Sequence, residues 1–441
     1  MIASEATTAW WRPERAAPSG LTAQPGGRLA FGALFAFTGI LILSPQAWFP
    51  AFRSLRIALL AAGVAIIAHL LGGVIRRRPG QRHPEVVIAF CLAAWAVLTV
   101  PISLWPGGSV SVLTDLFLKA IVFFWLIGVL VTTGPRLRMF LRLLVVCSIP
   151  LAVTAIRNYR SGVFLEASGA VMRIAGYNVG GSGLTENPND MALMLNLLIP
   201  FAAALLAIER RLAWRVVAAS ALLLSIAAVV ATFSRAGFLT LVAIGIVGLV
   251  TMARRRPVAA LGIVLVLAAS SPLIPRGYLE RLSTITNISS DPTGSSQGRW
   301  TDLTVAAEFV ARHPLTGVGL GQNVLALNRE RGPTWREVHN VYLQYAVDLG
   351  LPGLALFLWL FVALFRAAGR VRRLAVSNTA CRDVGIVAGG VQVALVGFAV
   401  AAMFHPVAYQ FYFFCIAGLA LAVKNVFSAA VASSRLAQQP V

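Results

Sequence analysis

Long apolar runs separated by short polar segments dominate the pattern of this chain. After Arg254, Arg255 and Arg256, Pro257 begins a run of Ala, Val, Leu, Ile and Gly that carries no charge until Arg276. A helix of about 20 apolar residues spans the hydrocarbon core of a bilayer. The pattern predicts an all-α, polytopic membrane protein with about twelve transmembrane helices, at 29–47, 55–75, 86–104, 112–132, 138–156, 190–207, 214–232, 236–253, 257–275, 341–365, 386–404 and 408–427.

The composition agrees with this class. The chain is 58% hydrophobic and 12% charged, whereas a soluble domain carries about 25% charged residues. A net charge of +21 in a soluble protein would indicate nucleic acid as a partner. Here the positions of the basic residues follow the predicted membrane topology instead. We therefore expect a lipid bilayer, and not a nucleic acid, as the partner of the basic residues.

Arginines gather in every second connection between the predicted helices, and this predicts the orientation. The positive-inside rule places these connections and both termini in the cytoplasm. The two longer loops on the other side, 157–189 and 276–340, then face outward. We therefore expect a cytoplasmic tail at 1–28, nine transmembrane helices over 29–275, an outer loop at 276–340, three more helices over 341–427 and a cytoplasmic tail at 428–441.

The large outer loop between the ninth and tenth helices is predicted to contain short surface helices. Apolar side chains recur at helical spacing within 301–312, which predicts an amphipathic helix along the outer surface. A second surface stretch follows at 321–330. Residues 283–298 are rich in Ser, Thr, Asn, Asp and Gly and indicate a flexible segment.

Three arginines of separate outer loops are candidates for an anion site: Arg173, Arg235 and Arg299. Arg235 stands in a connection of a few residues between two apolar helices. A charge so near the hydrocarbon is costly and is usually paired or functional, although the side chain could also reach the interface without further role. Arg235 also lies near the start of the next helix, where free N–H groups favour anions.

His339 is the candidate base, because it stands at the outer end of the tenth predicted helix. An imidazole can accept and return a proton near neutral pH, although a single histidine is more often structural. A base beside several arginines fits transfer from a phosphate-activated donor, whose leaving diphosphate arginine can neutralise. His313 and His405 each precede proline, and we interpret them as markers of helix ends.

Other polar features have simpler interpretations. Asn187, Asn189 or Asp190 could cap the helix that begins near 190. The four cysteines form no CxxC pair, and no metal-ligand spacing occurs. The segment Gly317–Gly321, GVGLG, lacks the strand and helix context of a nucleotide site. We therefore predict neither a metal nor another cofactor.

At three segments the chain resembles the O-antigen ligase and O-antigen polymerase superfamily of bacterial envelopes. The first is SRAGF at 234–238, with Ala236 where the family often has glycine. The second is GRW at 298–300 followed by HPLTGVGLG at 313–321. The third is HNVYL at 339–343, which continues to DLGLPG at 348–353. The ordered set, together with a large outer loop, carries the resemblance over about 230–355.

The resemblance implies a metal-independent, inverting membrane glycosyltransferase of the bacterial inner membrane, with 276–340 as a periplasmic catalytic loop. The donor would be a glycan linked to undecaprenyl diphosphate, and the acceptor a lipid A core or another glycan. By this resemblance His339 is the general base, and Arg235, Arg299 and Arg173 hold the diphosphate. The supporting residues would be Asn340, Asn187 and Tyr342.

Three functions remain open. An O-antigen ligase of lipopolysaccharide biosynthesis, which attaches O-antigen to lipid A core, is favoured. The alternative is a repeat-unit polymerase for O-antigen or exopolysaccharide, because the sequence does not identify the acceptor. A transporter or lipid-linked-sugar flippase belongs to another class. It is disfavoured because transporters commonly carry polar residues at mid-membrane, whereas polarity here concentrates in the outer loops.

Overall fold

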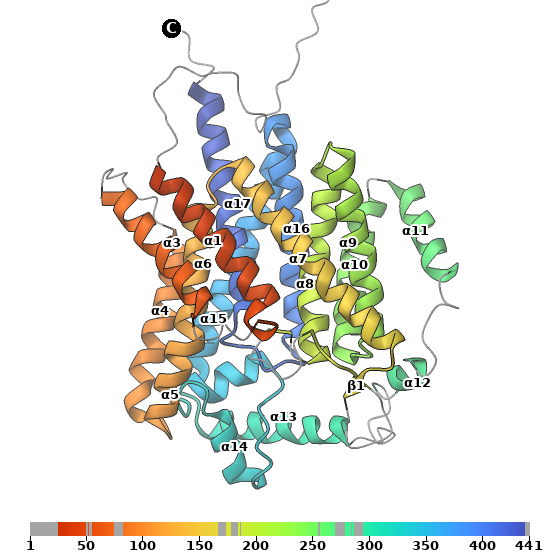
Figure 1. The fold of residues 1–441 in the computed structure, drawn as a ribbon. Helices are drawn as coiled ribbons and strands as arrows, with labels where there is room; N and C mark the ends of the chain where they lie inside the picture. Colours follow the sequence, from red (N-terminus) through yellow and green to blue (C-terminus); the bar gives the residue numbers. More distant parts are fainter. Residues whose placement is uncertain are drawn as a thin grey trace, which may run out of the picture.

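The structure, a computed structural model, is a bundle of long helices with short helices lying across one end (Figure 1). It describes residues 25–49, 52, 55–74, 83–165, 173–177, 184, 185, 187–254, 256–269, 278–283, 285 and 294–436. The first half contains α1 (Pro25–Leu43), α3 (Ile57–Val74), α4 (Pro84–Thr99), α5 (Pro106–Val112), α6 (Leu118–Leu130), α7 (Gly134–Arg160), α8 (Pro188–Ile208) and α9 (Leu212–Ala231). The second half contains α10 (Arg235–Ala253), α11 (Pro257–Ala269), α12 (Tyr278–Ser283), α13 (Ser295–Arg312), α14 (Asn323–Arg331), α15 (Val341–Leu374), α16 (Arg382–Ala401) and α17 (Phe411–Leu436).

Short elements complete the chain. A π-helical segment, Leu113–Phe117, joins α5 to α6, and single 3-10 turns occur at Pro45–Ala47, Val100–Ile102, Ala375–Ser377 and Thr379–Cys381. A two-stranded antiparallel sheet pairs β1 (Phe164–Leu165) with β2 (Arg173–Ile174) in the loop between α7 and α8. The all-α prediction is confirmed, apart from this small sheet.

Nine helical stretches among the described residues are long and apolar enough to cross a membrane, and each coincides with one of the twelve predicted helices. They are Pro84–Ile102, Pro106–Leu130, Gly134–Arg160, Pro188–Ile208, Leu212–Ala231, Arg235–Ala253, Val341–Ser377, Thr379–Ala401 and Phe411–Ser434. The apolar helices α1 and α3 are shorter. Residues 270–275 of the ninth predicted helix lie outside the described residues, so the total of twelve stays a prediction. The domain boundaries stay predictions too, since 1–24 and 437–441 of the two tails also fall outside.

Helix α8 is the most enclosed of these stretches and forms the centre of the bundle. It packs against α7, α9, α10 and α16. Gly237 of α10 lies against Ala192 of α8, and the buried Asn196 donates to the Gly237 carbonyl at 2.9 Å. The central position of α8 brings the start of α10 close to the start of α8, where the site described below begins.

Helices α13 and α14 lie at one end of the bundle, called here the loop end; Figure 1 shows α13 lying across the long helices. The amphipathic helix predicted at 301–312 is confirmed, but it begins earlier, at Ser295. The prediction of a flexible segment over 283–298 is therefore wrong for Ser283, which ends α12, and for the last four residues, which begin α13. Composition favoured a loop there, but the helix starts directly after its N-cap, Gly294, whose φ is 63°. Residues 284 and 286–293 lie outside the described residues.

Side-chain caps fix where three helices begin at the loop end. Asn187 accepts hydrogen bonds from the backbone N–H groups of Asn189 and Asp190 at the start of α8. Ser234 accepts from Gly237 N at 3.1 Å, and Asn340 accepts from Leu343 N at 3.0 Å. Each cap satisfies N–H groups that have no partner within the helix. Asn187 is thus a helix cap, which was one of its two interpretations.

Candidate active site at the loop end

Residues 294–340 pack onto the N-terminal end of α15 through a small apolar core. This core contains Ala306, Phe309, Val318, Ala326, Leu327, Val338 and Val347. It joins α13, α14 and α15, and one of its members directly precedes His339. The position of the candidate base therefore depends on how this loop packs.

Glycines allow the loop to approach α15 at the point where that helix is broken. Gly350 has a φ of 68° inside α15, and a Cβ on it would collide with the carbonyl of Leu315. The N–H of Val318 donates to Val347 O, and the N–H of Gly319 donates to Asp348 O, both at 2.9 Å. The GVGLG segment thus supplies N–H donors to the carbonyls at the break in α15. The close approach of the two backbones accounts for the glycines, so no nucleotide site is needed to explain them.

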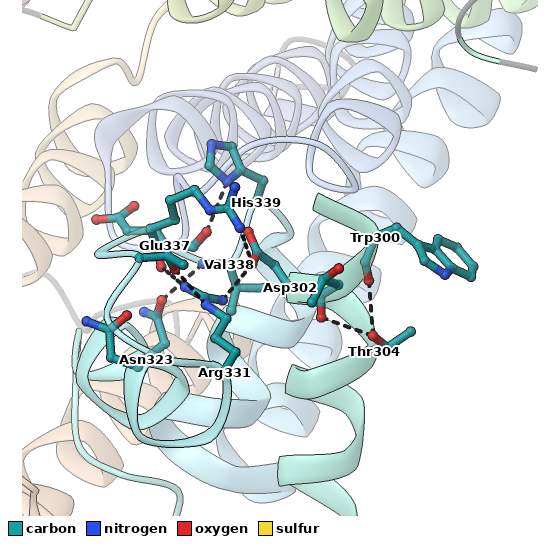
Figure 2. A network of polar contacts seen from close by, with 12 residues as sticks. Trp300, Asp302, Thr304, Asn323, Arg331, Glu337, Val338 and His339 are labelled. Atoms are coloured by element: carbon teal, nitrogen blue, oxygen red, sulfur yellow. Dashed lines mark hydrogen bonds and ion pairs between the residues drawn. The ribbon is translucent and has the colours of Figure 1, made fainter. Parts of the chain in front are cut away.

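Asp302 of α13 forms an ion-paired clamp, which Figure 2 shows together with its neighbours. Its buried carboxylate lies 2.8 Å from Nη1 of Arg331 and 3.2 Å from Nη2 of Arg336. Arg331 also donates to the carbonyl of Arg336 at 2.6 Å. Gly298 makes room for this arrangement, because a Cβ there would collide with the guanidinium of Arg336. The clamp ties α13 and α14 to the segment that leads into His339.

A second anchor lies on the other side of the same segment. Asn323 accepts from the N–H of Val338 at 3.1 Å and donates to both carboxylate oxygens of Asp348, at 3.3 and 3.2 Å. The hydroxyl of Tyr409 donates to Asp348 at 3.0 Å. Arg336 and Val338 are therefore both held, and the backbone on which His339 stands is fixed from two sides (Figure 2).

His339 is half-buried, with Nδ1 at 3.0 Å from the carbonyl of Glu337. A carbonyl only accepts, so Nδ1 carries the proton in this contact and Nε2 is the basic nitrogen. Burial, followed by the positive charge of Arg299, lowers the pKa of His339 to about 4. The imidazole is therefore neutral at pH 7 and able to accept a proton.

Arg235 and Arg299 lie on neighbouring elements at this end. Nη1 of Arg235, in the first turn of α10, donates to Oγ of Ser296 at 2.7 Å. Ser296 and Arg299 are three residues apart on α13, so they share one face of that helix. Since Arg299 also acts on the pKa of His339, the structure brings Arg235, Arg299 and His339 to one region. The Arg173 backbone lies in β2, and its side chain lies outside what the structure describes, so its role stays a prediction.

Two of the three predicted supporting residues, Asn340 and Tyr342, fix the start of α15 against the C-terminal end of α16 and the residues that follow it. Besides capping α15, Asn340 approaches the carbonyl of Met403 through Nδ2, at 3.5 Å. The hydroxyl of Tyr342 donates to Ala399 O at 2.9 Å. Both residues therefore hold the helix that follows His339. Asn187, by contrast, caps the start of α8.

Sequence reasoning missed several residues that shape the site. Asp302 pairs with Arg331 across 29 positions. Asn323 pairs with Val338 across 15 positions and with Asp348 across 25. No local pattern signals such pairing. His405 was interpreted as marking a helix end, yet it is buried and its electrostatic effect reaches His339. Among the described residues, no group of three or more His, Cys, Asp or Glu side chains is arranged to hold a metal ion.

The comparison with protein families agrees with this arrangement. Residues 218–358 match the family described as O-antigen ligase, which supports the resemblance to the O-antigen ligase and polymerase superfamily. The matched segment includes Arg235, Arg299, His339, Asn340 and Tyr342, whereas Arg173 and Asn187 precede it. No curated protein matches the chain. The match and the long apolar helices together point to a multi-pass bacterial membrane protein.

Proposed function

We propose that this protein is an O-antigen ligase that transfers a glycan from undecaprenyl diphosphate to a hydroxyl of the lipid A core. The observation that carries the proposal is the meeting of His339 with Arg299 and Arg235 at the loop end, inside the segment that matches the ligase family. We propose further that this end faces the periplasm, in the inner membrane, and that both termini are cytoplasmic.

The arginines bind the donor diphosphate in this mechanism. A guanidinium offers fixed, paired hydrogen bonds to phosphate oxygens. As the bond from the anomeric carbon to the diphosphate breaks, negative charge grows on the leaving oxygen, and Arg235 and Arg299 stabilise it. Undecaprenyl diphosphate then leaves without activation by ATP. Arg173 is a third candidate for the same anion.

His339 supplies the base. Nε2 takes the proton from the acceptor hydroxyl, whose oxygen attacks the anomeric carbon from the face opposite the diphosphate, so the configuration inverts. A pKa of about 4 makes the unliganded imidazole a weak base. A bound diphosphate offsets the charge of Arg299 and raises the pKa of His339 toward neutrality, where a general base works best. Donor binding thus prepares the base.

The metal-independent character of the reaction rests on the same arginines. Divalent cations neutralise leaving phosphates in many transferases, and here guanidinium groups would take that role. The proposal therefore includes no metal and no other cofactor.

A gene deletion tests the proposal and separates it from its alternatives. A ligase predicts lipopolysaccharide core without attached polymer, while polymer accumulates on undecaprenyl diphosphate. A repeat-unit polymerase, which would use the same donor chemistry, predicts core that carries one repeat. Loss of lipid-linked glycan from the outer leaflet would instead indicate a flippase. Restoration by the wild-type gene, and not by His339→Ala, connects the phenotype to the site.

A further inference from the structure

His405 is a buried histidine in the short connection between α16 and α17, and it is only 2% exposed. Nδ1 lies 2.9 Å from the carbonyl of Ala401, and Nε2 lies 3.3 Å from the carbonyl of Asn189. Both ring nitrogens therefore face oxygens that can only accept. A neutral imidazole has one N–H and satisfies one of these contacts, whereas an imidazolium satisfies both.

The second contact connects His405 to the diphosphate site. Asn189, whose carbonyl faces Nε2, accepts from the hydroxyl of Ser234 at 2.9 Å through its side chain. Ser234 caps α10 and directly precedes Arg235. A continuous chain of contacts therefore runs from the imidazole to the turn that carries the candidate diphosphate arginine.

Charged and titratable groups surround His405 on the elements packed near it. Arg299 of α13 and His339 before α15 interact with it electrostatically. Asp190 follows Asn189 on α8 and accepts a hydrogen bond from the Asn187 amide. Arg235 of α10 bonds to Ser296. Burial, with a smaller contribution from Arg299, lowers the pKa of His405 to about 4, although both carbonyl contacts act to raise it.

We infer that His405 is a positioning residue of the diphosphate site, which takes up a proton when the anion binds and then holds Asn189 and the Ser234–Arg235 turn with both ring N–H groups. The inference rests on the proposed function, because it needs an anion beside Arg235 and Arg299. A bound diphosphate offsets the charge of Arg299 and favours the imidazolium. The imidazolium in turn adds positive charge behind the site, so proton and anion strengthen each other's binding.

The protonation state can be observed directly. The sequence contains five histidines, so nitrogen NMR of histidine-labelled full-length protein in lipid is feasible. The His405 signal is assigned with His405→Gln or, if that variant does not fold, by substituting the other four histidines. The probes are inorganic pyrophosphate and undecaprenyl diphosphate at pH 7. We expect one protonated ring nitrogen on His405 without probe and two with it.

Each outcome has a separate meaning. A probe that binds while His405 keeps one unprotonated nitrogen overturns the inference and leaves the proposed function intact. A probe that does not bind at the loop end overturns the diphosphate site, and this inference falls with it.

The pH dependence of affinity gives a second readout. A group that is neutral when free and charged when bound makes affinity fall about tenfold per pH unit, from its free pKa near 4 up to its raised pKa in the complex. The pKa of His339 also rises in the proposed complex, so His405→Gln should lose only the part of the slope that His405 contributes. The variant should bind pyrophosphate roughly 5–150-fold more weakly at pH 6. His313→Gln is the matched control, because that ring is exposed at the end of α13. A purely structural role for His405 predicts equal slopes in all three proteins, and that result would contradict the inference.

Discussion

Arginines at the two ends of the bundle have different neighbours. At the end opposite the loop end, Arg142 lies 2.7 Å from Glu209, whose side chain is 1% exposed. Arg138 lies between the same carboxylate, at 3.9 Å, and Asp383, at 3.5 Å. Glu209 and Asp383 thus pair with Arg138 and Arg142, and the pairs join α7 to the end of α8 and the start of α16.

At the loop end, the charged groups that act on the pKa of His339 are basic. Arg299, His405 and Arg336 all lower it. Asp302 pairs with both Arg331 and Arg336 within the clamp, so one carboxylate faces two guanidinium groups there. The arginines of α7 thus hold helices together through ion pairs, whereas Arg299 acts on the protonation of a candidate base. We propose that the donor diphosphate binds at this end, against Arg235 and Arg299.

The largest expected effect is loss of the base. We expect His339→Ala to lower the rate of transfer from a lipid-diphosphate glycan by about 10²–10⁴-fold, the usual contribution of a general base. The rate is measured with purified protein in lipid. His313→Ala, at the exposed end of α13, should keep the wild-type rate. A wild-type rate in His339→Ala would show that His339 is not the general base.

Replacing the guanidinium group of Arg235 should have the next largest effect on the turnover rate. Arg235→Lys keeps the charge but loses the paired geometry, and we expect the turnover rate to fall roughly 10²-fold. Arg142→Lys makes the same exchange at the opposite end, where the lysine ammonium can still pair with the carboxylate of Glu209. The turnover rate of this variant should therefore change by less than about twofold. Equal losses in both variants would contradict the functional difference between the two ends.

Breaking the clamp should affect stability and rate together. Asp302→Asn leaves the largely buried Arg331 without its charged partner, and removing one member of a buried pair typically costs about 3–5 kcal/mol. We expect a lower thermal unfolding midpoint in detergent and a smaller loss of rate than in His339→Ala. An unchanged midpoint would show that the clamp does not hold the loop in place.

The pH profile should separate the free enzyme from the donor complex. A base works when neutral, so the rate rises with pH through the pKa of His339. In kcat/KM, which reports the free enzyme, this rise should lie near pH 4. In kcat, which reports the complex, the bound diphosphate should move the rise to higher pH. Coincident profiles would mean that the diphosphate does not act on His339.

The smallest expected effect concerns metal ions. If guanidinium groups neutralise the leaving diphosphate, an excess of EDTA should leave the transfer rate of the wild-type protein unchanged. Restoration of a lost rate by Mg²⁺ or Mn²⁺ would contradict the metal-independent mechanism.

Sequence reasoning predicted the helices and proposed candidate side chains for the site, because both depend on local patterns. Apolar runs predict α8 or α15 directly, and Asn187 and Ser234 stand where caps are expected. The anchors of the site were not predictable in this way. Asp302 meets Arg331, and Asn323 meets Asp348, only after the loop has folded onto α15. His405 precedes proline in a short connection, and its burial follows from the packing of α8 against α16.

The most direct test of the account is the position of undecaprenyl diphosphate in an experimental structure of the full-length protein. We expect both phosphates at the loop end, with their oxygens about 3 Å from the guanidinium nitrogens of Arg235 and Arg299, and with Nε2 of His339 facing the place of the anomeric carbon. A diphosphate bound at the opposite end, or away from both arginines, would contradict the account.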